Sequence, residues 1–316
     1  MRARTRSFAV FTAGLLARLA GSVWLLATAS FLLVQLMPGD PVARLLGPTA
    51  TADDRARMRV VLGLDEPLPE RYLTFLHDLV TFTFGSSFGG QSVTDILSER
   101  AMPTMELALA SIVVTGLLSV VLGLGMAAAT EGEKRPFVSN SFTAAMGVIA
   151  SVPAYVLGVG LVAAFAVMWS IFPVAGYDGV SSLVLPVLAL SLPATAVLAR
   201  IVRVEALGAL QSDYARTVRS KQLPAHRLYL FHVLPNVVAG ALTIAGVMFG
   251  YLLGGSVIVE NVFQWPGLGT TLVAAVDSRD YPVLQIAIIL IGISVLLVNS
   301  LVDLALYAVD PRVRTV

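Results

Sequence analysis

The sequence of 316 residues contains no cysteine, and only 13% of its residues are charged. Without thiols the chain has no disulfides, no thiolate metal ligands and no cysteine nucleophile. The low charged fraction excludes an ordinary soluble globule, because such domains carry about 25% charged residues. The formal net charge is only +1, so nothing in the composition indicates a nucleic-acid partner.

Hydrophobic residues take the place of the missing charges. They make up 57% of the chain, and the mean hydropathy is +0.83. A bilayer crossing needs about 20 apolar residues, and six runs reach that length: 10–36, 102–130, 137–172, 183–203, 237–259 and 283–309. The third run is long enough to tilt or to contain a break near Pro153. The sequence therefore predicts an all-α integral membrane protein with six transmembrane helices.

The first apolar run has a competing interpretation as a signal peptide. Three arginines precede it, Arg18 interrupts it, and Ala27-Thr28-Ala29 is typical of a cleavage site. The apolar core of a signal peptide is about 7 to 15 residues long, whereas this run continues through Leu36. An arginine within a span can extend its charge to the interface. We therefore expect an uncleaved first span.

A polar segment, residues 37–101, follows the first span. It opens with the sequence PGDP at 38–41 and carries charges of both signs. A segment of about 65 residues is too long to be a simple connector. We expect a folded loop with short helices at 53–62 and 70–82 and a turn at 84–90.

The distribution of lysine and arginine predicts the orientation. With the N-terminus inside, 14 of the 21 basic residues lie in inside segments, and six of the other seven lie in the long 37–101 loop. Long loops count little in the positive-inside rule. Both termini and the 203–236 segment are therefore expected in the cytoplasm, and the 37–101 loop outside.

The segment 203–236 is polar and basic although it lies between two apolar runs. Leu207, Leu210, Tyr214 and Val218 follow a helical spacing, which predicts one amphipathic helix that ends at Pro224. A second short helix is expected at 225–233. The segment is interpreted as a docking helix for a cytoplasmic partner, with an amphipathic connector resting on the membrane surface as the alternative.

A set of motifs in a fixed order identifies a family resemblance. They are PGDP (38–41), LGLDEPLPERY (62–72), FGSSF (84–88), FPVAGY (172–177), DYARTVRSKQL (213–223), HVLPN (232–236), VENVFQWPGLG (259–269), RDYPV (279–283) and VDLALYAVDPRVR (302–314). With this spacing the chain resembles the permease subunits of bacterial ABC importers, in the dipeptide, oligopeptide and nickel branch. The resemblance implies a type I ABC importer permease fold with a long extracytoplasmic loop after the first helix.

The resemblance also implies which residues couple to an ATPase. They would form the coupling helix of the so-called EAA loop: Asp213, Tyr214, Ala215, Arg216, Thr217, Arg219, Lys221, Leu223 and Pro224. One position departs from the family pattern, because Gln222 stands where the family usually has a glycine that eases a tight turn. Pro224 follows, and its fixed backbone angle could compensate.

Partners and location follow from the same resemblance. The chain has no GxxxxGK[ST] phosphate-binding loop, so it is expected to bind no cofactor and to catalyse nothing, with ATP and Mg held by two ABC ATPase subunits or domains. A second homologous permease, an extracytoplasmic substrate-binding protein and the lipid bilayer of the bacterial cytoplasmic (inner) membrane complete the expected surroundings. The expected divisions are 1–36, 37–101, 102–309 with the coupling loop 203–236, and 310–316.

The substrate is expected to be a di- or oligopeptide, with nickel or a metal chelate as the alternative. A bare metal would need clustered imidazole, carboxylate or thiolate ligands, and all three histidines lie outside the apolar runs. The same positions exclude the serine and histidine pair of an intramembrane protease. An aspartyl protease needs two facing carboxylates, and an ion-coupled transporter needs a relay of them. This chain has few carboxylates in its apolar runs.

Four polar residues in or near the spans are candidates for the pathway or for helix packing: Glu260, Asn261, Asn299 and Asp303. Glu260 and Asn261 suit an interfacial cap or, alternatively, a substrate contact. Asp303 should face another helix, either to bond it or to line the path. Glu106 suits the positive end of a helix dipole. The glycines at 246, 250, 254 and 255 suit packing against the partner permease, although they also permit gate motion.

Overall fold

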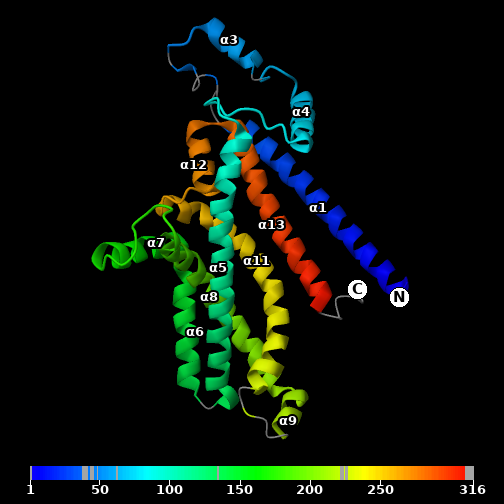
Figure 1. Cartoon of the computed structure of the whole chain (residues 1–316), viewed down its shortest axis with the longest axis vertical. Coiled ribbons are helices and arrows are strands. Elements are labelled where there is room, and N and C mark those ends of the chain that lie inside the picture. The colour runs from blue at the N-terminus through cyan, green and yellow to red at the C-terminus, as the bar shows by residue number, and fades with distance from the viewer. Residues whose placement is uncertain are drawn as a thin grey trace. The chain divides into compact units, whose positions relative to one another are not determined.

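The computed structural model describes residues 2–37, 42, 46–47, 49–61, 63–133, 135–220, 224 and 227–309. These residues are almost entirely helical, and they contain no strand, only one isolated bridge between Ser86 and Ser92. The elements are α1 (Arg2–Leu36), α3 (Ala52–Val61), α4 (Leu68–Thr81), α5 (Val93–Ala129), η1 (Glu131–Glu133), α6 (Pro136–Ser151), α7 (Ala154–Leu161), η2 (Val162–Met168), α8 (Val180–Gln211), α9 (Asp213–Ser220), η3 (Leu228–Val233), α11 (Leu234–Val262), α12 (Leu268–Ser278) and α13 (Tyr281–Val309) (Figure 1).

Among the described residues, four helices are long and apolar enough to cross a membrane: α1 from Thr12, α5, α8 and α13 as far as Leu304. A fifth candidate is the pair formed by α6 and the α7–η2 segment, which bends by 92°. The bend lies at Pro153, whose ring removes a backbone donor and favours an extended residue before it. Val152 is extended, with ψ of 121°. The predicted break in this run is confirmed, and η2 continues as a π-helix.

The start of α5 differs from the sequence-based boundary at 102. The helix begins at Val93 and runs through Pro103 without a break. The hydroxyl of Ser92 accepts a 3.4 Å hydrogen bond from the amide of Asp95, and Asp95 adds a carboxylate to the first turn. Both features stabilise a helix start. The last nine residues of the expected 37–101 loop are therefore helical.

The expected short helices and turn of the polar segment are confirmed as α3, α4 and the 84–90 turn. Thr51, the residue before α3, caps the helix reciprocally with Asp54. The Thr51 hydroxyl accepts a hydrogen bond from the amide of Asp54 and donates one to Asp54 Oδ2 at 2.6 Å. These hydrogen bonds from Thr51 lower the pKa of Asp54. In the turn, Gly85 and Gly90 have positive φ angles of 68° and 82°, which favour glycine.

The chain divides into two compact units. The first consists of residues 1–104 and 266–296, and the second of residues 105–265 and 297–316. In the first unit, buried residues of α1, α5, α12 and α13 form one core, which includes Ala27, Leu97, Leu268 and Ile289. The amide of Leu268 also donates a 2.7 Å hydrogen bond to the buried hydroxyl of Thr104.

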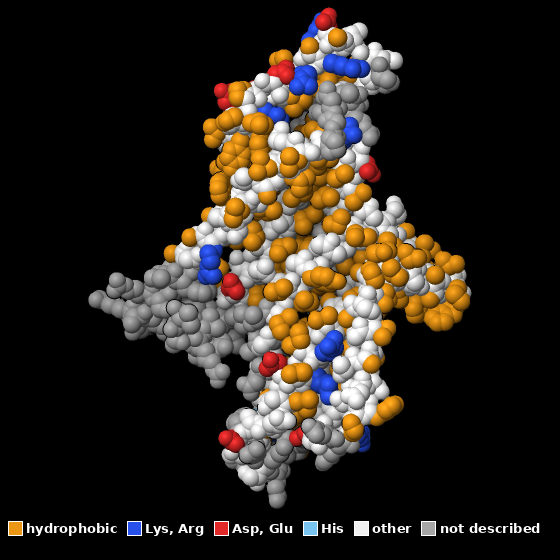
Figure 2. All heavy atoms as spheres, turned by 180° about the vertical axis from the view of Figure 1, so that it is seen from behind, with side chains coloured by type: hydrophobic (Ala, Val, Ile, Leu, Met, Phe, Trp, Pro, Cys, Tyr) orange, Lys and Arg blue, Asp and Glu red, His pale blue; other side chains and the backbone are white. Residues whose placement is uncertain are grey.

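The second unit has two cores along α8. One contains Leu107, Leu190, Phe263 and Trp265, and the other gathers side chains of α5, α8, α9, η3 and α11. Outside these cores the α7–η2 segment carries exposed apolar side chains, which Figure 2 shows as a continuous apolar surface. Such a surface suits contact with lipid or with another membrane chain rather than with water.

Candidate functional site

The segment expected to dock a partner forms a separate short helix, α9. The single helix predicted through Leu207, Leu210, Tyr214 and Val218 was wrong, because α8 ends at Gln211 and Ser212 is extended, with ψ of 154°. The hydroxyl of Ser212 accepts a 3.3 Å hydrogen bond from the amide of Ala215 and so caps α9. Serine followed by aspartate is a helix-start signal, and it ends the helical spacing that the apolar residues alone suggested.

One side of α9 packs into the second core of its unit. Ala215 and Val218 are buried, at 1% and 6% exposure, together with Leu210, Leu228 and Val233. Asp213, Thr217 and Ser220 are exposed. The helix is therefore held by its apolar residues and presents a polar surface away from the core.

Several expected coupling residues lie outside what the structure describes. They are the whole of Lys221 and Leu223, with Gln222 between them, and the side chains of Tyr214, Arg216 and Arg219. Pro224 is exposed, and the helix expected at 225–233 is described from Arg227, as η3.

Two polar contacts that the sequence analysis missed hold the neighbourhood of α9 in place. The hydroxyl of Tyr229 in η3 donates a 3.0 Å hydrogen bond to Glu131 Oε2 in η1. Arg203 in α8 donates to the hydroxyls of Ser139 and Thr130, at 2.6 and 3.3 Å from Nη2, and lies 5.9 Å from the ring centroid of Phe142. In the sequence Arg203 is only one of the basic residues that favour a cytoplasmic 203–236 segment. Hydroxyl residues at 130 and 139 gave no periodic signal that would have paired them with it.

Glu260 lies in the last turn of α11 and is fully buried. Its Oε1 accepts a 3.3 Å hydrogen bond from the hydroxyl of Ser256, one turn earlier, and its backbone oxygen accepts from the amide of Trp265 at 2.8 Å. Asn261 is half-buried and donates to the backbone oxygen of Val257. These two neighbours thus stabilise the end of α11 from inside the unit, and the carboxylate does not lie at its surface.

A second polar cluster surrounds Tyr177, in the segment between η2 and α8. Its hydroxyl donates a 2.7 Å hydrogen bond to Glu106 Oε2, and its ring meets that of Trp265 edge-on, with centroids 4.7 Å apart. The hydrogen bond to Glu106 raises the pKa of Tyr177. Tyr177 therefore joins the start of the second unit to the turn after α11.

Asn299 and Asp303 lie one turn apart on α13 but in different surroundings. Asn299 Oδ1 is buried against α11, 3.1 Å from where a Cβ on Gly246 would lie, and has no hydrogen-bond partner among the described residues. Gly246 therefore packs against a helix of its own chain. Asp303 is exposed, so no described residue of the unit covers it.

The described residues include no group of three or more histidine, aspartate or glutamate side chains placed to hold a metal ion. The structure therefore brings together no cluster of the kind that chelates bare nickel.

Two family models together match nearly the whole chain. Residues 119–315 match the model described as binding-protein-dependent transport system inner membrane component, and residues 13–108 match that of the N-terminal part of such components.

Two relatives align with most of the chain, and one solved structure aligns with about two thirds of it. A protein of Sinorhizobium fredii named "Probable peptide ABC transporter permease protein y4tP" is 38% identical over 293 residues, covering 90% of this chain and 92% of that protein. The glutathione transport system permease protein GsiC of Escherichia coli K12 is 37% identical over 287 residues, with the same coverage of both chains. A chain from the inward-facing MetNI methionine ABC transporter superposes with a TM-score of 0.56 at 19% identity, covering 69% of this chain and 97% of that one, which shows a shared fold.

Proposed function

Because the chain belongs to the family of binding-protein-dependent transport system inner membrane components, we propose that it is the permease subunit of an ATP-driven importer. The apolar helices supply the membrane-spanning part. The observation that carries the proposal is the family match together with α9, a short helix held by buried Ala215 and Val218 that presents polar residues outward.

The proposed topology has six spans with both termini in the cytoplasm of a bacterium. The spans are α1, α5, the bent α6–α7–η2 pair, α8, α11 and α13. The proposal keeps residues 1–36 as the tail and first span, 37–101 as an outer region that includes the start of α5, 102–309 as the core and 310–316 as a tail. The excess of basic residues in the segments at 134–135, 200–227 and both termini supports it.

The proposed role of α9 is coupling. Two ATPase subunits or domains, which bind ATP and Mg, would close on the polar surface of this helix. A movement of α9 would then pass to η1, η3 and α8, which the Tyr229–Glu131 and Arg203–Ser139 contacts hold together with their neighbours. The Tyr229–Glu131 contact joins η3 to η1, and the Arg203–Ser139 contact joins α8 to α6. Ala215 and Val218 of α9 pack in the same core as residues of α8 and η3, and coupling requires such a physical connection.

The proposed path lies between this chain and a second, homologous permease, with an external binding protein delivering the substrate. Asp303, exposed on α13, supports α13 as a surface that another chain covers, because a carboxylate facing lipid is unfavourable. Glu260 and Asn261 would support the end of α11 beside that path.

Peptides are the proposed substrates. The names of the relatives assign a peptide and glutathione, itself a short peptide, to proteins that align over 90% of this chain. The absence of a chelating group among the described residues favours peptide over bare metal.

The test of this proposal uses the permeases and ATPases reconstituted in liposomes with the external binding protein. ATP-dependent uptake of a labelled di- or tripeptide is expected, and uptake of free nickel that needs no binding protein would contradict the proposal. For coupling, Arg219→Glu should insert normally but lose co-purifying ATPase or peptide-stimulated hydrolysis, because reversing a charge at an interface weakens it. Arg135→Glu, a reversal on the neighbouring α5–α6 connection, is the matched control and should behave as wild type.

A further inference from the structure

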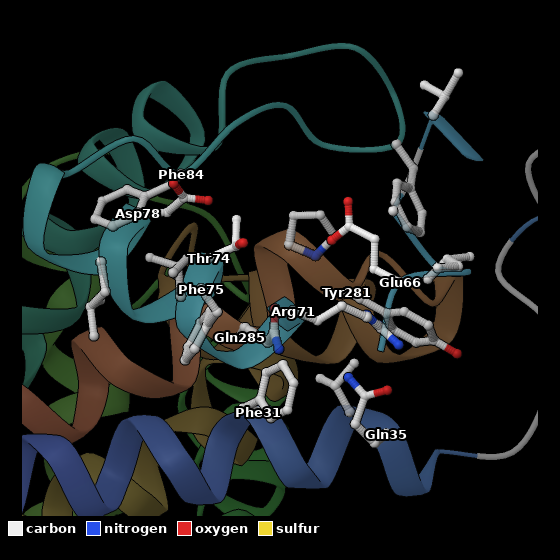
Figure 3. A pocket seen from close by; sticks show the side chains of 18 residues that line it. Phe31, Gln35, Glu66, Arg71, Thr74, Phe75, Asp78, Phe84, Tyr281 and Gln285 are labelled. Carbon is white, nitrogen blue, oxygen red and sulfur yellow. The ribbon is translucent and has the colours of Figure 1, made fainter. Parts of the chain in front are cut away.

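A cavity of 390 Å³ lies within the first unit. Figure 3 shows its walls: Phe31 and Gln35 come from α1, Arg71, Thr74, Phe75 and Asp78 follow one another along α4, and Tyr281 and Gln285 come from α13. Ligand pockets in proteins are typically about 300–1,000 Å³ and combine apolar walls with a few polar groups. The size and lining fit that class.

Side-chain contacts connect the elements that line the cavity and hold them in place. The hydroxyls of Thr28 and Tyr72 are 2.7 Å apart, and the ring of Phe31 packs on that of Phe75 at 5.6 Å, which joins α4 to α1. On the α13 side, the ring of Phe88 lies 6.1 Å from that of Tyr281.

Asp280 holds that last wall in place. It is 8% exposed and accepts hydrogen bonds from the hydroxyl of Ser87 and, at 3.1 Å, from the amide of Phe88. The walls are therefore positioned before any ligand arrives, which lowers the entropic cost of binding.

Three half-buried side chains in the lining have unused hydrogen-bonding groups. The guanidinium of Arg71 and the amides of Gln35 and Gln285 have no hydrogen-bond or ion-pair partner among the residues that the structure describes. A guanidinium offers five donors in a planar fork that matches a carboxylate. A ligand carboxylate would satisfy Arg71, and the two amides could bond peptide groups.

Carboxylates supply the opposite charge. Asp78 and Glu66 both line the cavity, so its formal charge is −1 with Arg71 included. Exposed His77 has Nδ1 3.9 Å from Asp78 Oδ1 but is not part of the lining. A simple anion would be repelled by the carboxylates and a simple cation by Arg71. A ligand with both charges matches the lining.

The spacing of the charges sets the length of that ligand. Arg71 and Asp78 are seven residues apart on one face of α4, which places them about 10 Å apart along the helix axis. An extended peptide spans at most about 3.3–3.6 Å per residue, so two or three residues reach from one charge to the other. The rings of Phe31, Phe75 and Phe84 offer apolar surface to its side chains.

We propose that this cavity is a peptide-binding site on the permease itself, for zwitterionic di- or tripeptides with an apolar side chain. Arg71 would bind the carboxylate and Asp78 the ammonium group. The inference rests on the proposed function, since it assigns a substrate contact to the region that we propose faces outside. It adds a substrate-binding site on the permease, separate from the one on the binding protein.

The test measures equilibrium binding to the permease–ATPase complex in nanodiscs without the binding protein. The probes are labelled Ala-Phe and Ala-Ala-Phe, each also as the C-terminal amide and as the N-acetyl form. Wild type should bind the unblocked peptides best. Arg71→Gln should weaken the binding of unblocked peptides about tenfold to a hundredfold but leave the affinity for the amide unchanged. Asp78→Asn should likewise weaken the binding of unblocked peptides but leave the affinity for the N-acetyl form unchanged.

Two matched controls separate these effects from general damage. Arg100→Gln and Asp95→Asn remove the same charges from α5, outside the cavity, and should bind as wild type does. A folding defect would weaken all probes equally, whereas loss of one charge contact changes only the probe that carries its partner.

Specific outcomes would overturn the inference. It fails if wild type binds no peptide, if the Arg71 and Asp78 variants bind as wild type does, or if a zwitterionic phospholipid occupies the site and peptides do not displace it. Uptake by the complete transporter separates the two proposals. Peptide uptake without binding at this site removes only the inference, whereas no uptake and no binding of any peptide removes the proposed function as well.

Discussion

Nη2 of Arg203 donates a 2.6 Å hydrogen bond to Oγ of Ser139, 64 residues earlier in the chain. The same guanidinium reaches Thr130 Oγ1 at 3.3 Å, so one side chain of α8 joins the start of α6 to the residue after α5. Hydrogen bonds to a charged group are worth about 1.5–3 kcal/mol each, more than neutral ones. This contact therefore stabilises the packing of α8 against the start of α6 and the residue after α5.

Replacing Arg203 tests that contact. Arg203→Met keeps the apolar stem and removes the donors, so we expect stability to fall by about 1.5–3 kcal/mol. The measurement is the thermal midpoint of the detergent-purified protein, followed by fluorescence-detected gel filtration. Arg200→Met is the control, because Arg200 is exposed on the same helix. Equal midpoints for the two variants would show that the contact contributes nothing.

Ser212 should determine the stability of α9. Ser212→Ala removes the acceptor for the Ala215 amide, and loss of such a cap typically costs about 1 kcal/mol. We expect faster hydrogen exchange of the amides of residues 213–218 in the assembled complex, with Ser212→Asp restoring protection. Ser220→Ala changes a serine at the other end of α9, whose hydroxyl donates to the backbone oxygen of Thr217, and should leave the exchange of residues 213–218 unchanged. If Ser212→Ala also leaves exchange unchanged, the cap is not what stabilises α9.

Two glycines of α5 should respond oppositely to the same substitution. A Cβ on Gly123 would lie 2.7 Å from Val202 Cβ and 2.8 Å from the backbone oxygen of Ala199, whereas nothing lies within 4 Å of one on Gly125. Overpacking of this kind costs about 1–3 kcal/mol, and alanine otherwise favours helix. Gly123→Ala should lower the thermal midpoint and Gly125→Ala should keep or raise it. Equal midpoints for the two variants would contradict the close approach of α5 to α8.

The proposed orientation is testable because the chain has no native cysteine. Single cysteines at Asp65 and Tyr177 should react with a membrane-impermeant maleimide in intact cells, and cysteines at Lys134, Ser212 and Arg314 should react only after permeabilisation. Labelling of position 212 but not 65 in intact cells would reverse the topology.

The helical class and the positions of most helices follow from the sequence alone. Long apolar runs cannot be solvated by water, and in lipid their backbone groups must bond within the segment, so a helix is the available structure for each run. A break at Pro153 is one of two outcomes that the sequence predicts for this run, because proline lacks the donor and its ring crowds the preceding turn. Proline does not dictate a break, since α5 continues through Pro103 and α8 through Pro186 and Pro193. Local rules also place α3, α4 and the glycine turn at 84–90.

The tertiary structure alone decided the contacts between distant residues. Ser139 lies 64 residues from Arg203, and Tyr177 lies 71 residues from Glu106; no local pattern pairs them, because a hydrogen bond depends on the positions of side chains after the helices pack. The same holds for the cavity, where Gln35, Arg71 and Gln285 meet from three helices. The apolar periodicity also predicts one helix that continues to Pro224, whereas α8 ends at Gln211. Apolar spacing continues across Ser212, but Ser212 followed by Asp213 is a helix-start signal that ends one helix and begins another.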